Sequence, residues 1–342
     1  MNGFSMLVAP VAFGLFAGCS PAQSTSKHRD QLSPLVLADP DEPTLHAGIW
    51  VPNDDSKHGV VVLLEDTDGS MASKDLLDAI QAELISEKIL VIRLRCTEMS
   101  FVERRRALRR WIEAIELRPD VKANSLALVG HGWGGAIAAR CAAAFNDRIN
   151  CIALLASPGL PGRLNDVDSI KSYLSSLGAP PDLIREAISA RGELIGYASQ
   201  DVNEVALKQA AEDSVQSIVR ASGQDYRAVT EVLAEAKDPE WRYLMSYDPR
   251  MTMPRLGGVE VLAIQGTEDA QFDGGANLHA LGESARLRAV AIDTRLLPGL
   301  DHGMARMNAD GSRSIDEGVV HEVVEWTTKR IGQPEKTKGG LE

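Results

Sequence analysis

The most informative stretch of this sequence is Leu128-Val129-Gly130-His131-Gly132-Trp133-Gly134-Gly135. It differs at one position from G-x-S-x-G, a pattern in which a sharp turn between a strand and a helix exposes a serine hydroxyl as a nucleophile. Gly132 stands at the serine position. The stretch therefore predicts a strand, a tight turn and a helix, without the hydroxyl group that such a turn presents.

Strand-like and helix-like segments alternate on both sides of this turn. The run from Gly59 to Glu65 is almost continuously apolar, as a strand covered on both faces requires. From Lys74 to Lys88 the apolar residues fall at helical spacing. Further strands are predicted at 89–94, 125–129, 150–156, 259–265 and 290–297, and further helices at 101–117, 134–145, 277–287 and 314–329. This alternation predicts an α/β fold, with a mostly parallel sheet, helices on both faces and an antiparallel edge strand near 44–51.

The alternation of strands and helices is interrupted by one long segment, between the strand that ends near Ser157 and the strand that begins at Val259. It contains helical patterns at 167–177, 181–197, 203–221 and 226–236 and no convincing strand. An insertion at this point overhangs the carboxyl ends of the central strands, where open α/β sheets bind their ligands. We therefore predict a core at 44–157 and 250–331, an inserted helical cap at 158–249 and a flexible tail at 332–342.

The N-terminus has the pattern of an export signal. An apolar run from Phe4 to Phe16 is followed by Ala17-Gly18-Cys19 and a polar stretch, which resembles a bacterial lipoprotein signal with lipid attachment at Cys19. The run is shorter than the roughly 20 residues of a transmembrane helix. We expect a signal peptide at 1–19, a linker at 20–43 and a lipid-anchored body in the bacterial cell envelope, in the periplasm or on the cell surface. The alternative is a plain secretory signal with an incidental cysteine.

Composition excludes several classes of partner. The 342 residues are 44% hydrophobic and 25% charged, which is enough for a sizeable core. The sequence has 36 basic and 48 acidic residues, which gives a net charge of -12. This negative charge disfavours nucleic acid and anionic lipid surfaces as binding partners. Membrane contact is expected only through the anchor. The sequence has no C-x-x-C pair and no histidines at metal-ligand spacing, so neither a metal nor a cofactor is predicted. The sequence does not decide whether two of Cys96, Cys141 and Cys151 form a disulfide.

Two residues downstream of the turn have the positions of an acid and a base. Asp269 follows the strand predicted at 259–265, and His302 lies in the loop after the last strand, in Pro298-Gly299-Leu300-Asp301-His302. The order nucleophile, acid, histidine is the order of the triad in proteins with the G-x-S-x-G turn. A carboxylate at Asp269 would hold the imidazole of His302 in one tautomer and stabilise its cation.

Taken together, these motifs resemble the α/β-hydrolase superfamily of serine esterases and acyl hydrolases, particularly bacterial members with a helical cap. The similarity extends from about Thr44 to Ile331 and includes Leu155-Ala156-Ser157-Pro158-Gly159 and Gly266-Thr267-Glu268-Asp269. The resemblance implies an α/β-hydrolase fold, Asp269 as the acid and His302 as the base. It also implies that the Trp133 N–H is one donor to the oxyanion.

The sequence departs from this pattern at the rim of the site. Gly132 replaces the serine, and removing the serine from a working triad costs about a millionfold in turnover. The loop after the first parallel strand supplies the second oxyanion donor in the family, which places Asp66 and Thr67 there. It reads Glu65-Asp66-Thr67-Asp68, and carboxylates at this point oppose developing negative charge. The segment after Leu94 also lacks the family's Asp-Arg-Gly turn.

Four interpretations of the retained Asp269 and His302 stay open. The pair is a relic of lost catalysis, or it activates a water in the space that the serine has left. Alternatively, Ser157 acts as a substitute nucleophile, because it too ends a core strand, or the chain is altered from a parent that carried the serine.

Two functional hypotheses follow. We favour a lipid-anchored pseudohydrolase that binds a small apolar or acyl-bearing ligand under its cap, or a protein partner on its surface. The alternative is a hydrolase of carboxylic esters that uses Asp269 and His302 with water or another nucleophile.

Overall fold

The computed structural model describes residues 33–39, 42–54, 56–66, 71–94, 100–200 and 203–332. The predicted signal peptide with Cys19, most of the predicted linker, Thr67, Cys96 and the tail beyond 332 lie outside these residues. Among the helices that the structure does describe, none is both long enough and apolar enough to cross a bilayer.

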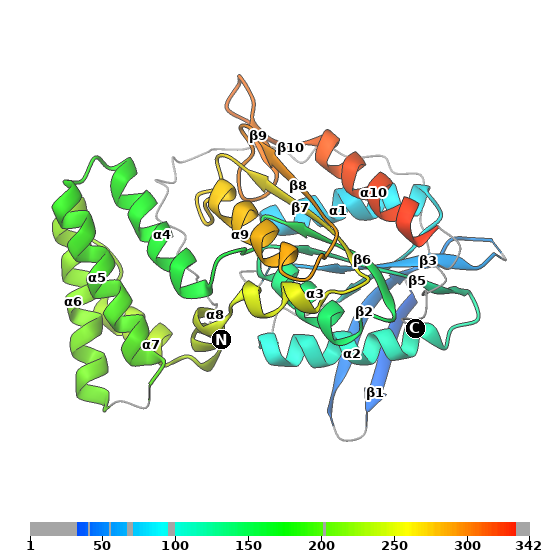
Figure 1. Cartoon of the computed structure of the whole chain (residues 1–342), viewed down its shortest axis with the longest axis horizontal. Coiled ribbons are helices and arrows are strands. Elements are labelled where there is room, and N and C mark those ends of the chain that lie inside the picture. Colours follow the sequence, from blue (N-terminus) through cyan, green and yellow to red (C-terminus); the bar gives the residue numbers. More distant parts are fainter. Residues whose placement is uncertain are drawn as a thin grey trace.

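The centre of the fold is an eight-stranded sheet in the order β1-β2-β4-β3-β5-β6-β7-β8 (Figure 1). Strands β3 to β8 run parallel, and β1 and β2 form an antiparallel hairpin in which β2 pairs with β4. The strands are β1 (Ser33–Asp39), β2 (Glu42–Trp50), β3 (His58–Leu64), β4 (Leu90–Leu94), β5 (Val121–His131), β6 (Ile149–Leu155), β7 (Glu260–Gly266) and β8 (Ile292–Leu297). A separate antiparallel pair is formed by β9 (Ala305–Met307) and β10 (Arg313–Ile315).

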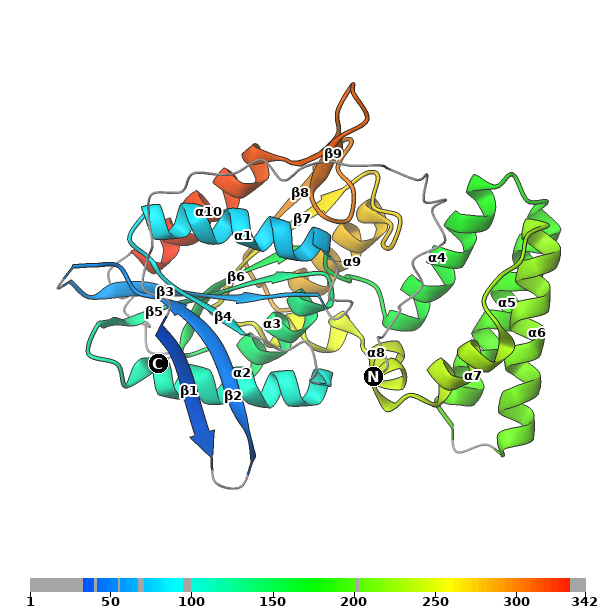
Figure 2. The ribbon, with the colours of Figure 1, turned by 180° about the vertical axis from the view of Figure 1, so that it is seen from behind.

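Helices cover both faces of the sheet, because its central strands are apolar on both sides. One face packs against α1 (Met71–Ser86) and α10 (Glu317–Ile331) (Figure 2). The other face packs against α2 (Phe101–Glu116), α3 (Trp133–Ala144) and α9 (Gly274–Arg286). Each face has its own cluster of buried side chains, so the sheet is the middle of three layers.

The cap lies beside the sheet and consists of five helices (Figure 1). They are α4 (Gly162–Ser176), α5 (Pro181–Ala198), α6 (Glu204–Ser222), α7 (Val229–Lys237) and α8 (Pro239–Ser246), followed by the 3-10 turns η1 (Pro249–Met251) and η2 (Met253–Arg255). Helices α4 to α6 share a small apolar core of their own. The fully buried Arg191 ties α5 to α4 through two hydrogen bonds to Asp166, of 2.7 and 2.8 Å.

The predicted fold class is confirmed, and the differences lie at its edges. Residues 33–39 form β1 inside the predicted linker, so that β1, and not the segment predicted at 44–51, is the edge of the sheet. Helix α8 was not predicted. Its signal is Asp238 before Pro239, because the Asp238 side chain accepts a hydrogen bond from the Glu240 N–H and proline suits the first helical position.

Candidate active site

The turn between β5 and α3 keeps the geometry of an exposed nucleophile without the side chain. Gly132 has φ 54° and ψ -128°, a backbone conformation that is strained for any residue with a Cβ atom. The neighbouring glycines allow close packing, since a Cβ at Gly134 would lie 2.5 Å from the carbonyl oxygens of Leu64 and Glu65. The structure therefore presents residue 132 to the site as the motif predicts.

The carboxylate of Asp66 occupies the place where a side chain at residue 132 would begin. Asp66 directly follows β3 and is buried. A Cβ on Gly132 would lie 1.8 Å from Asp66 Oδ2 and 2.3 Å from its Cγ. A serine at residue 132 and the observed Asp66 side chain therefore exclude one another.

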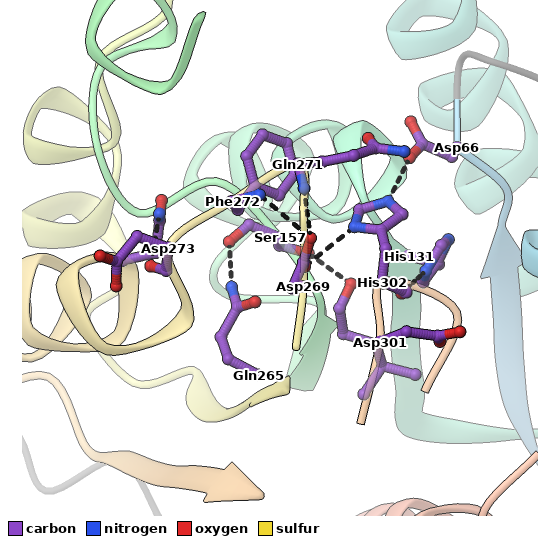
Figure 3. A network of polar contacts seen from close by, with 12 residues as sticks. Asp66, His131, Ser157, Gln265, Asp269, Gln271, Phe272, Asp273, Asp301 and His302 are labelled. Carbon is purple, nitrogen blue, oxygen red and sulfur yellow. Dashed lines mark hydrogen bonds and ion pairs between the residues drawn. The ribbon is translucent and has the colours of Figure 1, made fainter. Parts of the chain in front are cut away.

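Both oxygens of this carboxylate bind groups that would serve a serine in a triad. Asp66 Oδ1 accepts a hydrogen bond from the Trp133 N–H at 3.1 Å. Asp66 Oδ2 accepts one from His302 Nε2 at 3.1 Å (Figure 3). The Asp66 N–H donates to Ser73 Oγ at 3.1 Å. The Asp66 N–H is thus engaged by Ser73, and the Asp66 carboxylate engages the Trp133 N–H. This arrangement disfavours residue 66 as an oxyanion donor, and that assignment stays a prediction.

Asp269 and His302, the predicted acid and base, lie side by side. His302 Nδ1 donates to Asp269 Oδ2 at 2.9 Å. The other oxygen, Asp269 Oδ1, accepts hydrogen bonds from the backbone N–H groups of Gln271 and Phe272, at 2.8 and 3.0 Å. These bonds hold the carboxylate plane, and therefore the imidazole plane, in one orientation.

The two carboxylates hold a proton on each nitrogen of His302. Burial alone would lower the pKa of His302, but Asp269 and Asp66 outweigh it and raise that pKa to about 10. Burial would raise the pKa of Asp66, yet the hydrogen bond and the charge of His302 hold it below its usual value. The resting centre is therefore an imidazolium between two carboxylates, with one net negative charge.

His131 supports His302 from the other side. Its Nε2 lies 2.7 Å from the His302 carbonyl oxygen, to which it donates, and the two rings are 4.8 Å apart. Burial and the charge of His302 lower the pKa of His131 to about 4, so it is neutral. Asp66, His131 and His302 each offer a ligand atom within 4.8 Å of the others. Because Asp66 and His302 already bind each other directly, we assign no metal to this cluster.

Two sequence-based alternatives do not fit this geometry. The space that the serine would leave for a water is filled by Asp66. Ser157 is buried, and its hydroxyl donates to the carbonyl oxygens of Leu155 and Gly130 at 3.2 and 3.5 Å, not to His302. The observed geometry therefore favours neither the activated water at the serine position nor Ser157 as a substitute nucleophile, and both stay predictions.

A small cavity adjoins the centre between core and cap. Its volume is about 40 Å³, above the roughly 10–15 Å³ that one water requires. Trp133, Gln271 and Phe272 line it from the core, and α4, α7 and α8 complete its wall. Figure 3 shows the Gln271 side chain extending toward Asp66. The residues that orient Asp66 and Asp269 thus also form one wall of the cavity.

The comparisons with known proteins identify the fold. Est1E from Butyrivibrio proteoclasticus is similar in structure, with a TM-score of 0.54 and 12% identity over 88% of this chain and 99% of that one. Proline iminopeptidase from Mycobacterium smegmatis has a TM-score of 0.51 and 14% identity over 87% and 99%. A carboxyl esterase from Bacillus coagulans has a TM-score of 0.50 and 13% sequence identity, with 88% of this chain and 99% of that one covered.

A scan of protein-family models and a search of curated proteins give no match. At this low identity the structural likeness establishes the α/β-hydrolase fold alone. What the site does must therefore be argued from its own residues.

The charge of His302 gives a testable pH dependence. Because its folded pKa of about 10 exceeds the roughly 6.5 of an unfolded histidine, the ion pair stabilises the fold fully below pH 6.5 and is lost as pH rises toward 10. In histidine NMR spectra of the full-length protein we expect His302 to stay protonated at pH 8, and Asp66→Asn to lower its pKa. His302→Gln assigns the signal. A neutral His302 at pH 7 in the unaltered protein contradicts the ion pair.

Proposed function

We propose that this protein binds a small molecule between its core and its cap and does not hydrolyse esters by the serine mechanism. One observation carries the proposal: the Asp66 carboxylate takes the place of a side chain at residue 132 and accepts the Trp133 N–H. An ester carbonyl needs that N–H for its oxyanion, and a carboxylate there repels the same charge. In ester chemistry the protein is a pseudohydrolase.

The hydrolase fold and the cavity support a small-molecule ligand. Two buried polar atoms in the cavity wall have no hydrogen-bond partner within the described part of the chain, Trp133 Nε1 and Asn165 Oδ1. The Asn165 amide is oriented by its Nδ2, which donates to the Leu160 carbonyl oxygen at 3.0 Å. Leaving such atoms unpaired costs about 1–3 kcal/mol each. A ligand with both a donor and an acceptor satisfies them, whereas a purely apolar ligand does not.

Charge further restricts the ligand class. Asp166 and Glu235 also line the cavity, but Arg191 pairs with Asp166 and Arg227 pairs with Glu235. The wall is therefore close to neutral, and burying an unpaired ionic ligand against it is unfavourable. Trp241 and Met245 add apolar surface. We therefore infer a neutral ligand with a compact apolar part and a hydroxyl or primary amide group, in place of the apolar or acyl ligand predicted from the sequence.

Isobutyramide and isobutyrate test the ligand class, because they share a shape and differ in charge. We expect saturation-transfer NMR on the full-length protein to show binding of the amide and not of the acid. Trp133→Phe removes the indole N–H, and we expect it to weaken amide binding about three- to tenfold, the value of one hydrogen bond. Tyr197→Phe, on the exposed part of α5, is the matched control. Equal binding of acid and amide contradicts the assignment.

For location, we propose lipid attachment at Cys19 and residence in the cell envelope, on the basis of the N-terminal sequence. Cys19→Ser should abolish incorporation of labelled palmitate in a bacterial host and move the protein from the membrane to the soluble fraction. Cys141→Ser, at a buried free thiol, is the control. Unchanged labelling in Cys19→Ser contradicts the anchor.

Exchanging the side chains at residues 66 and 132 tests whether Asp66 prevents ester hydrolysis. The unaltered protein should hydrolyse nitrophenyl butyrate at background rate. Gly132→Ser alone should stay inactive, because its Cβ collides with Asp66. Asp66→Gly combined with Gly132→Ser frees the Trp133 N–H and restores the nucleophile, so turnover should rise on the order of a hundredfold or more, a fraction of what a triad serine contributes.

His302→Ala in the exchanged background is the control, and it should return turnover to background. The proposal fails if the unaltered protein already hydrolyses the ester in a His302-dependent way. It also fails if Gly132→Ser alone is as active as the exchanged pair.

A further inference from the structure

A second cavity lies on a different face of α8 from the cavity between core and cap. Its volume is about 330 Å³, which is enough for a drug-sized ligand. In α8, Trp241 and Met245 line the first cavity, whereas Tyr243 and Ser246 line the second. Among the described residues none lines both cavities. The second cavity is therefore a separate site from the candidate active site.

Three arginines line the second cavity from three different elements, and we call it the arginine cavity. Arg105 belongs to α2, Arg140 to α3 and Arg255 to η2. The carboxylate of Asp248 also lines it, but Arg250 already binds this carboxylate through hydrogen bonds of 2.6–3.0 Å. The C-terminal ends of α3 and α8 add about half a negative charge each. The wall therefore keeps a net positive charge in a chain whose net charge is -12.

The donors of the arginine cavity are available to a ligand. Within the described part of the chain, the guanidinium groups of Arg105 and Arg255 make no hydrogen bond and no ion pair. Arg140 is held in place, because its Nη1 donates to Tyr243 Oη and its guanidinium carbon lies 5.1 Å from the centre of the Tyr243 ring. Since Tyr243 Oη accepts that bond, its own proton can be donated to a ligand.

Contacts between the surrounding elements fix the shape of the arginine cavity. The ring of Phe101 in α2 lies 4.8 Å from that of Tyr243 in α8. Beyond the end of α3, Asn146 Nδ2 donates to the Arg255 carbonyl oxygen at 3.3 Å and so ties η2 to the core. Figures 1 and 2 both show α2, α3 and α8 close together at this place. The three arginines are therefore brought to one site by the packing of the core against α8.

We propose that the arginine cavity binds a small soluble molecule that carries a phosphate monoester group. Such a group has nearly two negative charges at pH 7 and three acceptor oxygens. Arginine suits it, because the guanidinium group offers paired N–H donors that match phosphate oxygens. A carboxylate or a sulfate ester has one negative charge and matches three guanidinium groups less well. This assignment goes beyond the proposed function, because it concerns a second cavity and a charged ligand.

The rest of the ligand is expected to be apolar or aromatic. The cavity has the volume of a site for a whole small molecule, so a phosphate group alone leaves much of it empty. Ala143, Ala144 and Met251 contribute apolar wall, and the half-buried ring of Tyr243 adds an aromatic surface. Phenyl phosphate combines both features and is therefore the probe of choice.

Titration calorimetry on the full-length protein compares phenyl phosphate with phenyl sulfate, which has a similar shape and one negative charge less. At a pH near 8, where the phosphate monoester is doubly charged, we expect phenyl phosphate to bind at least about tenfold more tightly, the value of one hydrogen bond between charged groups. The proposal is overturned if phenyl phosphate does not bind, or if the two anions bind equally.

Single substitutions locate the binding. Arg105→Gln and Arg255→Gln should each weaken phenyl phosphate binding at least about tenfold. Arg106→Gln is the matched control, because Arg106 is the next residue of α2, is exposed and does not line the cavity. We expect it to keep the affinity of the unaltered protein, and all three variants to unfold at the same temperature. An equal loss in Arg105→Gln and Arg106→Gln would overturn the site, because it indicates a general attraction of anions to α2.

A lipid is the other source of a phosphate monoester, and dihexanoyl phosphatidic acid tests it in solution. We expect it to bind more weakly than phenyl phosphate, because the negative charge of the chain disfavours an approach to anionic lipid surfaces. Tighter binding of the lipid that is lost in Arg255→Gln would overturn the assignment to a small soluble ester.

Discussion

The carboxylate of Asp66, held between the Trp133 N–H and His302 Nε2, is the interaction around which the site is arranged. It exists because Gly132 has no side chain, and it leaves no room for one. The two residues are 66 positions apart in sequence and meet because β3 and β5 are neighbouring parallel strands that end at the same edge of the sheet. The glycine on the elbow and the carboxylate on the adjacent loop thus share one space, which only one side chain can fill.

This constraint gives the remaining residues their roles. Asp269 and the backbone of Gln271 and Phe272 fix His302, and His302 carries the positive charge that permits a buried Asp66. His131 stays neutral beside it and binds its carbonyl oxygen. The charge on the centre is therefore set by its direct contacts, and any event that neutralises Asp66 changes the protonation of His302. The protonation state of this site therefore depends on the charge of one carboxylate, that of Asp66.

Much of this could be predicted from sequence, because it depends on local order. The alternating strands and helices, the cap and the loops that carry Asp269 and His302 follow from periodicity and from the chain order of the motifs. The position of Asp66 could not be predicted, since it depends on the distance between two loops that follow different strands. From the sequence, Asp66 could be identified only as a negative charge that would repel an oxyanion. A glycine at the nucleophile position together with a carboxylate in the neighbouring loop is the pattern to look for.

The central claim is that residues 66 and 132 compete for one space, and a double-mutant cycle on unfolding free energy tests it most directly. Gly132→Ala is compared in the unaltered protein and in Asp66→Gly; the backbone strain at φ 54° is common to both backgrounds and cancels. We predict that the alanine is more destabilising when Asp66 is present, with a coupling of about 1–3 kcal/mol. Additivity of the two substitutions to within about 0.5 kcal/mol would contradict the shared space.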